Sequence, residues 1–209
     1  MEHTQEITLD EAREQKLYDA LAADKSGQAW TQNGVVSQLW DLWYSERGTE
    51  ARKLMLEGEA LMQGGLIDDA RQVYLGLIEH YPSWAEAHNK LATLQFVAGE
   101  LNSSRETCFK VLKLKPKHFG ALSGFFQIEV QRQDLAGAKE AAQKLAQVHP
   151  AAARGILQAL QDAERGSSQG QGQGQGGTGA GVAVGRGGEP ESGGPAPAAD
   201  PAADEEIID

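Results

Sequence analysis

The chain has 209 residues, enough for one ordinary domain with tails, and its formal net charge of −11 at pH 7 disfavours a nucleic-acid-binding function, which needs a basic surface. Cys108 is the single cysteine, which excludes an intrachain disulfide and a cysteine-based metal site. No apolar run approaches the roughly 20 residues that span a bilayer, so we expect no membrane insertion.

The negative charge lies at the two ends of the chain. Residues 1–24 carry seven acids against two bases and residues 166–209 carry seven against one, whereas residues 51–165 sum to +1. The first residues lack the features of a secretory signal or an arginine-rich transit peptide. With Met1 as the natural start, the sequence therefore predicts a cytoplasmic protein. A plastid or another organelle is the alternative if Met1 is not the natural start.

Residues 1–50 are predicted to form an N-terminal cap of two helices. The first helix begins at Thr8 or Asp10, which can cap it, and runs to about Ala23. Ser26 and Gly27 break it, and the second helix runs from about Gln28 to Ser45. Three of the four tryptophans lie in this second helix, which is too many for an exposed surface. It is expected to cap the segment that follows, or alternatively to cover that segment's groove.

Residues 51–152 contain a repeat. Pro82, Pro116 and Pro150 are spaced by 116 − 82 = 34 and 150 − 116 = 34 residues, and a fixed period of this size indicates a repeat array. The same period relates small residues, apolar residues and turn residues: Ala70, Ser104 and Ala138; Leu77, Val111 and Leu145; Gly65, Gly99 and Gln133. Each unit is predicted to be a helix of about 14 residues, a tight turn, a second helix and a proline that ends it.

Two segments follow the repeats. Residues 153–165, with apolar Ile156, Leu157 and Leu160, are predicted to form a C-terminal capping helix. Residues 166–209 are rich in Gly, Gln, Ala and Pro and acidic at their end. Such a segment cannot bury enough apolar area to offset the entropy of ordering, so we expect a disordered tail.

The repeat resembles the tetratricopeptide repeat (TPR). Its copies span 51–84, 85–118 and 119–152, and in the first copy the family's signature positions hold Leu54, Gly58, Leu61, Ala70, Tyr74, Leu77 and Pro82. Trp40, Trp43 and the stretches AEAHNKLAT and KPKHFGALSG further resemble a little-characterised family of short TPR proteins of bacteria and plastid-bearing eukaryotes. The resemblance implies an all-α fold, a right-handed solenoid of three TPR helix pairs with helical caps.

The resemblance also implies a function and a site. A TPR protein is a non-catalytic scaffold that binds a partner protein or peptide in a groove, with complex assembly as one candidate role. The predicted groove residues are Met55, Glu59, Met62, Asn89, Thr93, Phe96, Gln127 and Val130. TPR proteins that clamp the C-terminal carboxylates of chaperones use Lys, Asn, Asn, Lys and Arg. Here those positions hold Met55, Glu59, Lys90, Gly120 and Gly124, so that ligand class is not expected.

Other candidate sites have simpler interpretations. KPKHFGALSGFF, residues 115–126, lacks the preceding strand of a phosphate-binding loop and is interpreted as a boundary between repeats. The lysines at 110, 113, 115 and 117 are interpreted as solvated charges at a helix end, with an anion-binding patch as the alternative. No histidine pair has the spacing of a zinc site, and no catalytic constellation appears, so no metal, cofactor or enzyme activity is expected. The alternative function is a structural protein whose apolar faces form a homodimer.

Overall fold

The computed structural model describes residues 2–24 and 34–170, and describes side chains for 10–24, 34–162 and 165. These residues form α-helices and no strand, so the predicted all-α fold class is confirmed. The helices are α1 (Glu2–Ala23), α2 (Val35–Ser45), α3 (Gly48–Gln63), α4 (Ile67–His80), α5 (Ala85–Val97), α6 (Leu101–Leu114), α7 (Phe119–Gln131), α8 (Leu135–Val148) and α9 (Pro150–Gly170). Residues 28–33 of the predicted tryptophan helix and 171–209 of the predicted tail lie outside the described residues.

The turns inside the helix pairs share one geometry, repeated every 34 residues. Gly65, Gly99 and Gln133 each have a positive φ, of 77°, 78° and 61°. In each turn two backbone N–H groups bond back to carbonyls of the preceding helix, as Gly65 does to Met62 and Leu66 does to Leu61. This is the Schellman arrangement, in which a left-handed residue satisfies the last carbonyls of a helix. Gln133 holds the conformation that glycine adopts more easily.

Small residues lie where paired helices cross, as the repeat predicts. Ala70, Ser104 and Ala138 are all fully buried. The Ser104 hydroxyl donates to the carbonyl of Ala92 at 2.7 Å, so its polar group is satisfied inside the core. Gly58 lies against the ring of Tyr74, where an added Cβ would clash. Close approach of the helices therefore depends on these positions remaining small.

Prolines separate the pairs. α4 ends two residues before Pro82 and α6 ends two residues before Pro116, whereas Pro150 is the first residue of α9. The first position of a helix tolerates proline because its N–H has no partner within the helix. α9 runs from Pro150 to Gly170 and so extends beyond the predicted capping helix, 153–165, at both ends.

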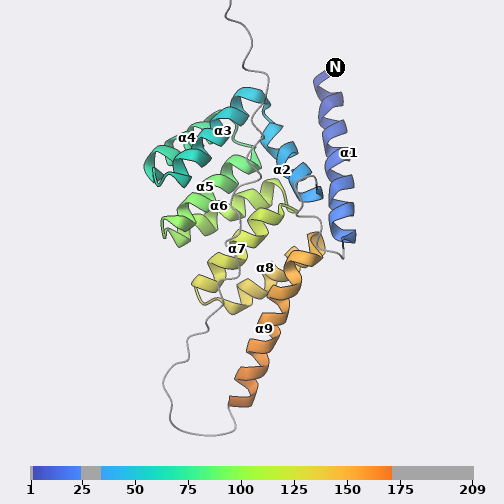
Figure 1. Ribbon diagram of the computed structural model, residues 1–209, viewed down its shortest axis with the longest axis vertical. Coiled ribbons are helices and arrows are strands. Elements are labelled where there is room, and N and C mark those ends of the chain that lie inside the picture. The colour runs from blue at the N-terminus through green and yellow to red at the C-terminus, as the bar shows by residue number, and fades with distance from the viewer. Residues whose placement is uncertain (1, 25–33, 171–209) are drawn as a thin grey trace, which may run out of the picture.

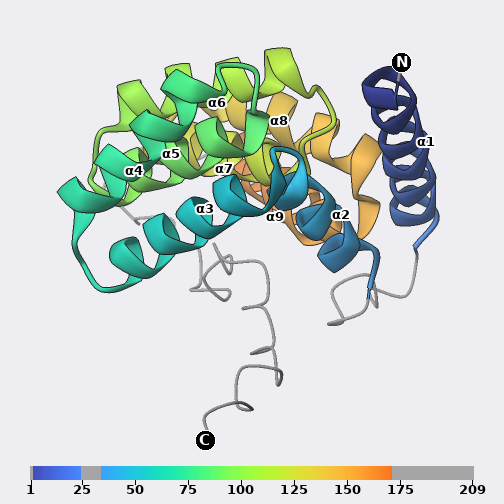
Figure 2. The same ribbon diagram turned by 90° about the horizontal axis from the view of Figure 1, so that it is seen from above.

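The stacked pairs run from α3 and α4 through α7 and α8 to α9, while α1 stands beside α2 at the flank of the stack (Figure 1). Figure 2 shows the same arrangement from above, with α1 at one end of the molecule. α2 packs on α3 and α5, and α1 packs on α2 and α8. One apolar core therefore combines residues from both ends of the chain: Leu17, Leu21, Leu39, Trp43, Phe119, Leu145 and Ala153.

Candidate functional site

α2 crosses the side of the array that the first helices of the pairs line. The indole of Trp43 stacks on the ring of His118 with centroids 4.2 Å apart, and Trp40 meets the edge of Phe119 at 5.2 Å. The indole N–H of Trp84 donates to the backbone carbonyl of Trp43 at 2.9 Å. α2 thus touches the starts of the second and third pairs. It does not act as a cap on the first pair alone, and it covers part of the predicted groove.

Gly120 explains how α2 fits there. An added Cβ on Gly120 would lie 2.7 Å from Cη2 of Trp40, so only glycine leaves room for the indole. The residues KPKHFGALSGFF do form a boundary between pairs, since His118 caps α7 by accepting from the N–H of Ala121 at 3.1 Å.

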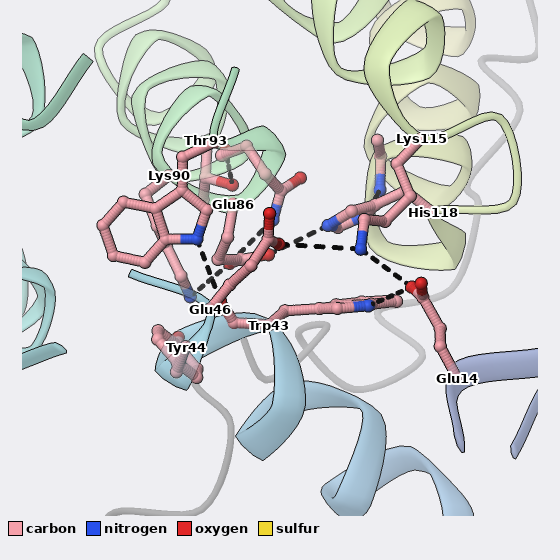
Figure 3. Close-up of polar contacts among 12 residues, drawn as sticks. Glu14, Trp43, Tyr44, Glu46, Glu86, Lys90, Thr93, Lys115 and His118 are labelled. Carbon is pink, nitrogen blue, oxygen red and sulfur yellow. Dashed lines mark hydrogen bonds and ion pairs between the residues drawn. The ribbon is translucent and has the colours of Figure 1, made fainter. Parts of the chain in front are cut away.

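A buried polar network lies beneath α2 (Figure 3). The ammonium of Lys90, 2% exposed, pairs with the carboxylate of Glu59 and lies 3.7 Å from that of Glu86. The hydroxyl of Tyr44 donates to Glu59. Nε2 of His118 lies 2.9 Å from the second oxygen of Glu86. Buried charges require partners of this kind, so the network fixes α2, α3, α5 and α7 relative to one another.

Hydrogen bonding determines the protonation state of His118. Because Nδ1 of the ring accepts from the backbone N–H of Ala121, it carries no proton itself. The ring proton therefore lies on Nε2 and is donated to Glu86, and the imidazole is neutral. The network then contains two carboxylates, one ammonium and neutral partners, which leaves one uncompensated negative charge.

The phenols that face this network are held protonated. Burial, followed by the charges of Glu86 and Glu59, raises the pKa of Tyr44 far above its ordinary value of 10.0. Burial raises the pKa of Tyr74 in the same direction, with the same two carboxylates contributing. A neutral phenol can donate to a carboxylate, and Tyr44 does so. Tyr44 therefore acts as a structural donor, whereas the buried hydroxyl of Tyr74 has no hydrogen-bond partner among the described residues.

A cleft of about 140 Å³ remains open beside Trp40, between α5 and α7. From α5 it is lined by Asn89, Thr93 and Phe96, and from α7 by Gly120, Gly124 and Gln127. Cys108 of α6 lies at its floor, where an added Cβ on Gly124 would be 3.8 Å from the thiol sulfur. Burial raises the pKa of Cys108 to about 12, so the thiol is protonated and serves as a small core group.

The eight predicted groove residues divide into three sets. Asn89, Thr93, Phe96 and Gln127 line the cleft together. The side chain of Met55 is completely buried in the core to which α2, α3 and α5 contribute. Glu59 is held in the polar network by its ion pair with Lys90. Met62 and Val130 are half-buried and do not line the cleft. Met55 and Glu59 are therefore unavailable to a ligand, because α2 covers them.

Sequence reasoning missed Trp40 as part of the site. The sequence left two positions open for the tryptophan helix, a cap on the array or a cover over its groove, and it did not identify Trp40 as one wall of the cleft. A signal was present in Gly120, Ser123 and Gly124, three small residues on one first helix, because such a gap invites a large side chain from elsewhere. Which side chain enters the gap depends on tertiary packing that no local pattern encodes.

The lysine row holds α1 in place. The Lys115 ammonium lies 2.8 Å from the Glu14 carboxylate and the Lys117 ammonium donates to the Gln15 side chain at 3.1 Å. The indole N–H of Trp43 also donates to Glu14, at 2.6 Å. Two of the four lysines thus serve the fold, while Lys110 and Lys113 are exposed.

The described residues offer neither a metal site nor a membrane span. They contain no group of three or more His, Cys, Asp or Glu side chains placed to hold a metal ion. In the part of the chain that the structure describes, no helix has the length and apolar character of a membrane span.

The pKa of His149 is lowered, mainly by burial, which favours a neutral ring.

Comparison with known proteins finds proteins that contain TPR repeats. No profile of a known protein family matches the chain. A TPR repeat-containing protein of Rhizobium etli is 47% identical over 47 residues, which are 22% of this chain and 23% of that protein. The chain therefore matches less than a quarter of that relative's length.

Solved structures give longer matches. The Sgt2 TPR domain from Aspergillus fumigatus has a TM-score of 0.53 at 21% identity, covering 65% of this chain and 94% of that one. The first TPR of Spaghetti (RPAP3), bound to the HSP90 peptide SRMEEVD, has a TM-score of 0.50 at 18% identity, covering 54% and 90%. The first TPR domain of human RPAP3 has a TM-score of 0.50 at 18% identity, covering 56% and 93%. At these identities the structures establish the fold.

Proposed function

Because the chain has the fold of the tetratricopeptide repeat superfamily, we propose that it is a non-catalytic scaffold that binds a partner polypeptide in the cleft between α5 and α7. The observation that carries the proposal is the convergence of four predicted groove residues, Asn89, Thr93, Phe96 and Gln127, on one cleft. The peptide complex of the RPAP3 repeat supports the general role of such a surface. Assembly of a larger complex is the biological role that this activity best fits.

We further propose that a chaperone tail held by a carboxylate clamp is not the ligand. Of the five clamp positions, Met55 is buried, Glu59 and Lys90 pair with each other, and Gly120 lies against Trp40. The fifth, Gly124, offers no cation. A terminal carboxylate would therefore find no donor set of the kind that a clamp supplies.

The division of the chain into a two-helix cap (1–50), three repeats (51–152), a C-terminal cap (153–165) and a tail (166–209) remains part of the proposal. In this division, the repeats carry the binding surface and α2 restricts the part of that surface that a ligand can reach. Trp40 would then act as one wall of the site and as a limit on how far a ligand extends.

Capture of partners from an extract of the source cells, followed by mass spectrometry, tests this function. Phe96→Ala removes a large side chain from the cleft, and we expect it to reduce partner recovery at least tenfold, as hot-spot truncations do. Val97→Ala is the matched control, because Val97 follows on the same helix, is 61% exposed and does not line the cleft.

Equal recovery with both variants would contradict the proposal. Light scattering across protein concentrations tests the alternative function, a structural protein that forms a homodimer, with the same variants. A tight dimer that Phe96→Ala dissociates would mean that a second copy of the chain, not another partner, occupies the cleft.

A further inference from the structure

The size of the cleft limits what can enter it. Its volume is about 140 Å³, and an engineered cavity of about 150 Å³ in another protein holds one benzene molecule. One phenyl or isobutyl group therefore fills the cleft. The face of a helix, with large side chains at successive turns, does not fit in this volume.

The walls of the cleft suit an apolar group. Trp40 and Phe96 contribute aromatic surface, and Gly124 leaves space in the cleft, since only the sulfur of Cys108 lies within 4 Å of an added Cβ. The hydroxyl of Thr93 is already bonded to the carbonyl of Asn89 at 3.0 Å. An entering apolar side chain therefore leaves that hydroxyl satisfied.

The charge beside the cleft is negative. Lys90 is the charged residue among those that line it, and this ammonium is shared by Glu59 and Glu86. With His118 neutral, the network carries one uncompensated negative charge. The local field of this network therefore attracts cations and repels carboxylates.

From these three observations we propose that the cleft binds a segment of another protein that inserts one phenyl- or isobutyl-sized side chain flanked by Lys or Arg. The inference rests on the proposed function and specifies its ligand. It disfavours the chain's own acidic residues 204–209 as the occupant, although Ile207 and Ile208 have suitable size, because carboxylates surround them.

Three acetylated and amidated peptides test the ligand class on the full chain: GGKFKGG, GGEFEGG and GGKAKGG. Binding is followed by fluorescence, since Trp40 lines the cleft, and by chemical-shift changes of α5 and α7 amides. We expect GGKFKGG to bind at least tenfold more tightly than GGEFEGG, and GGKAKGG to show at least a tenfold loss. Equal or tighter binding of GGEFEGG overturns the charge requirement, and equal binding of GGKAKGG overturns the apolar one.

A variant whose side chain fills the cleft gives a second test of the proposal. Gly124→Leu places a side chain in the cleft and should lower the affinity for GGKFKGG at least tenfold. Gly76→Leu is the matched control, because Gly76 lies within α4 with open space around it, and should leave the affinity unchanged. Circular dichroism checks folding, and Ser123→Leu, on the same wall, replaces Gly124→Leu if that variant unfolds.

The remaining outcomes separate this inference from the proposed function. If no peptide binds while Phe96→Ala still abolishes partner capture, the ligand class is wrong and the scaffold function stands. If no peptide binds and Phe96→Ala captures partners normally, both proposals fail. If GGKFKGG binds only after residues 171–209 are removed, the chain's own tail is the occupant and the inference is overturned.

Discussion

Gly120 and Gly124 lie one turn apart on α7 and have opposite surroundings. An added Cβ on Gly120 would overlap the indole of Trp40, whereas one on Gly124 would make an ordinary contact with Cys108. We expect Gly120→Ala to destabilise the protein by about 1–3 kcal/mol through overpacking. Gly124→Ala should be neutral or stabilise by up to about 1 kcal/mol, because alanine has the higher helix propensity.

Urea unfolding of the two variants measures this difference. Equal stabilities of the two alanine variants would show that Trp40 does not pack against α7 in solution. That result would also remove the support for α2 as a wall of the cleft.

Gln133 is a second residue with a predictable cost. Its φ of 61° is left-handed, and in the two equivalent turns glycine takes this conformation. A non-glycine residue pays roughly 1–2 kcal/mol there, so we expect Gln133→Gly to stabilise the chain by about 1 kcal/mol. Gly99→Ala is the reciprocal variant and should destabilise it. Thermal unfolding would contradict the argument if the two variants shifted the melting temperature in the same direction.

At the scale of the element, α1 depends on one carboxylate. Glu14 accepts from the indole of Trp43 and pairs with Lys115, so it joins α1 to α2 and to the end of α6. Glu14→Ala should loosen α1, because the indole N–H of Trp43 loses its acceptor and Lys115 keeps only its longer ion pair, at 3.7 Å, with Glu46 of the α2–α3 connection. Hydrogen exchange of residues 10–23 is expected to accelerate at least tenfold, with exchange in α5 unchanged.

Glu11→Ala is the control for this experiment, since Glu11 lies on the same helix and is exposed. Unchanged exchange in the Glu14 variant would mean that apolar contacts of Leu17 and Leu21 alone hold the helix.

The elements themselves could be predicted because their causes are local. Prolines, turn residues and small residues at a fixed period define the three helix pairs, and the structure contains them. The sequence left the position of α2 open between a cap and a cover over the groove, because the choice depends on the fit of Trp40 over Gly120 and on the partners of Lys90. Because α2 covers α3 but leaves part of α5 uncovered, Met55 is buried while Asn89 and Phe96 of the candidate site line the cleft.

At the scale of the molecule, the shared core makes the two ends of the chain interdependent. Leu145 of α8 belongs to the same apolar cluster as Leu21 of α1 and Leu39 of α2. Leu145→Ala should cost about 2–5 kcal/mol, and we expect the loss of hydrogen-exchange protection to extend to α1 and α2. In an open repeat array, by contrast, each repeat contacts only its neighbours.

The comparison variant is Leu77→Ala, because Leu77 belongs to the other large cluster, around α3 to α5. Protection lost in α8 and α9 alone, with α1 and α2 unaffected by Leu145→Ala, would show that the ends fold independently.

The contacts of α2 also bear on how this protein could have evolved. Repeat proteins commonly change length by duplicating a unit, since each new copy stacks on the last. Here a fourth 34-residue unit inserted between α4 and α5 would separate Tyr44 and its partner Glu59 from Lys90, and Trp43 from His118. Duplication at that point would therefore break the contacts that join α2 to α5 and to the start of α7. Growth of the array between α4 and α5 is thus incompatible with the contacts of the tryptophan helix.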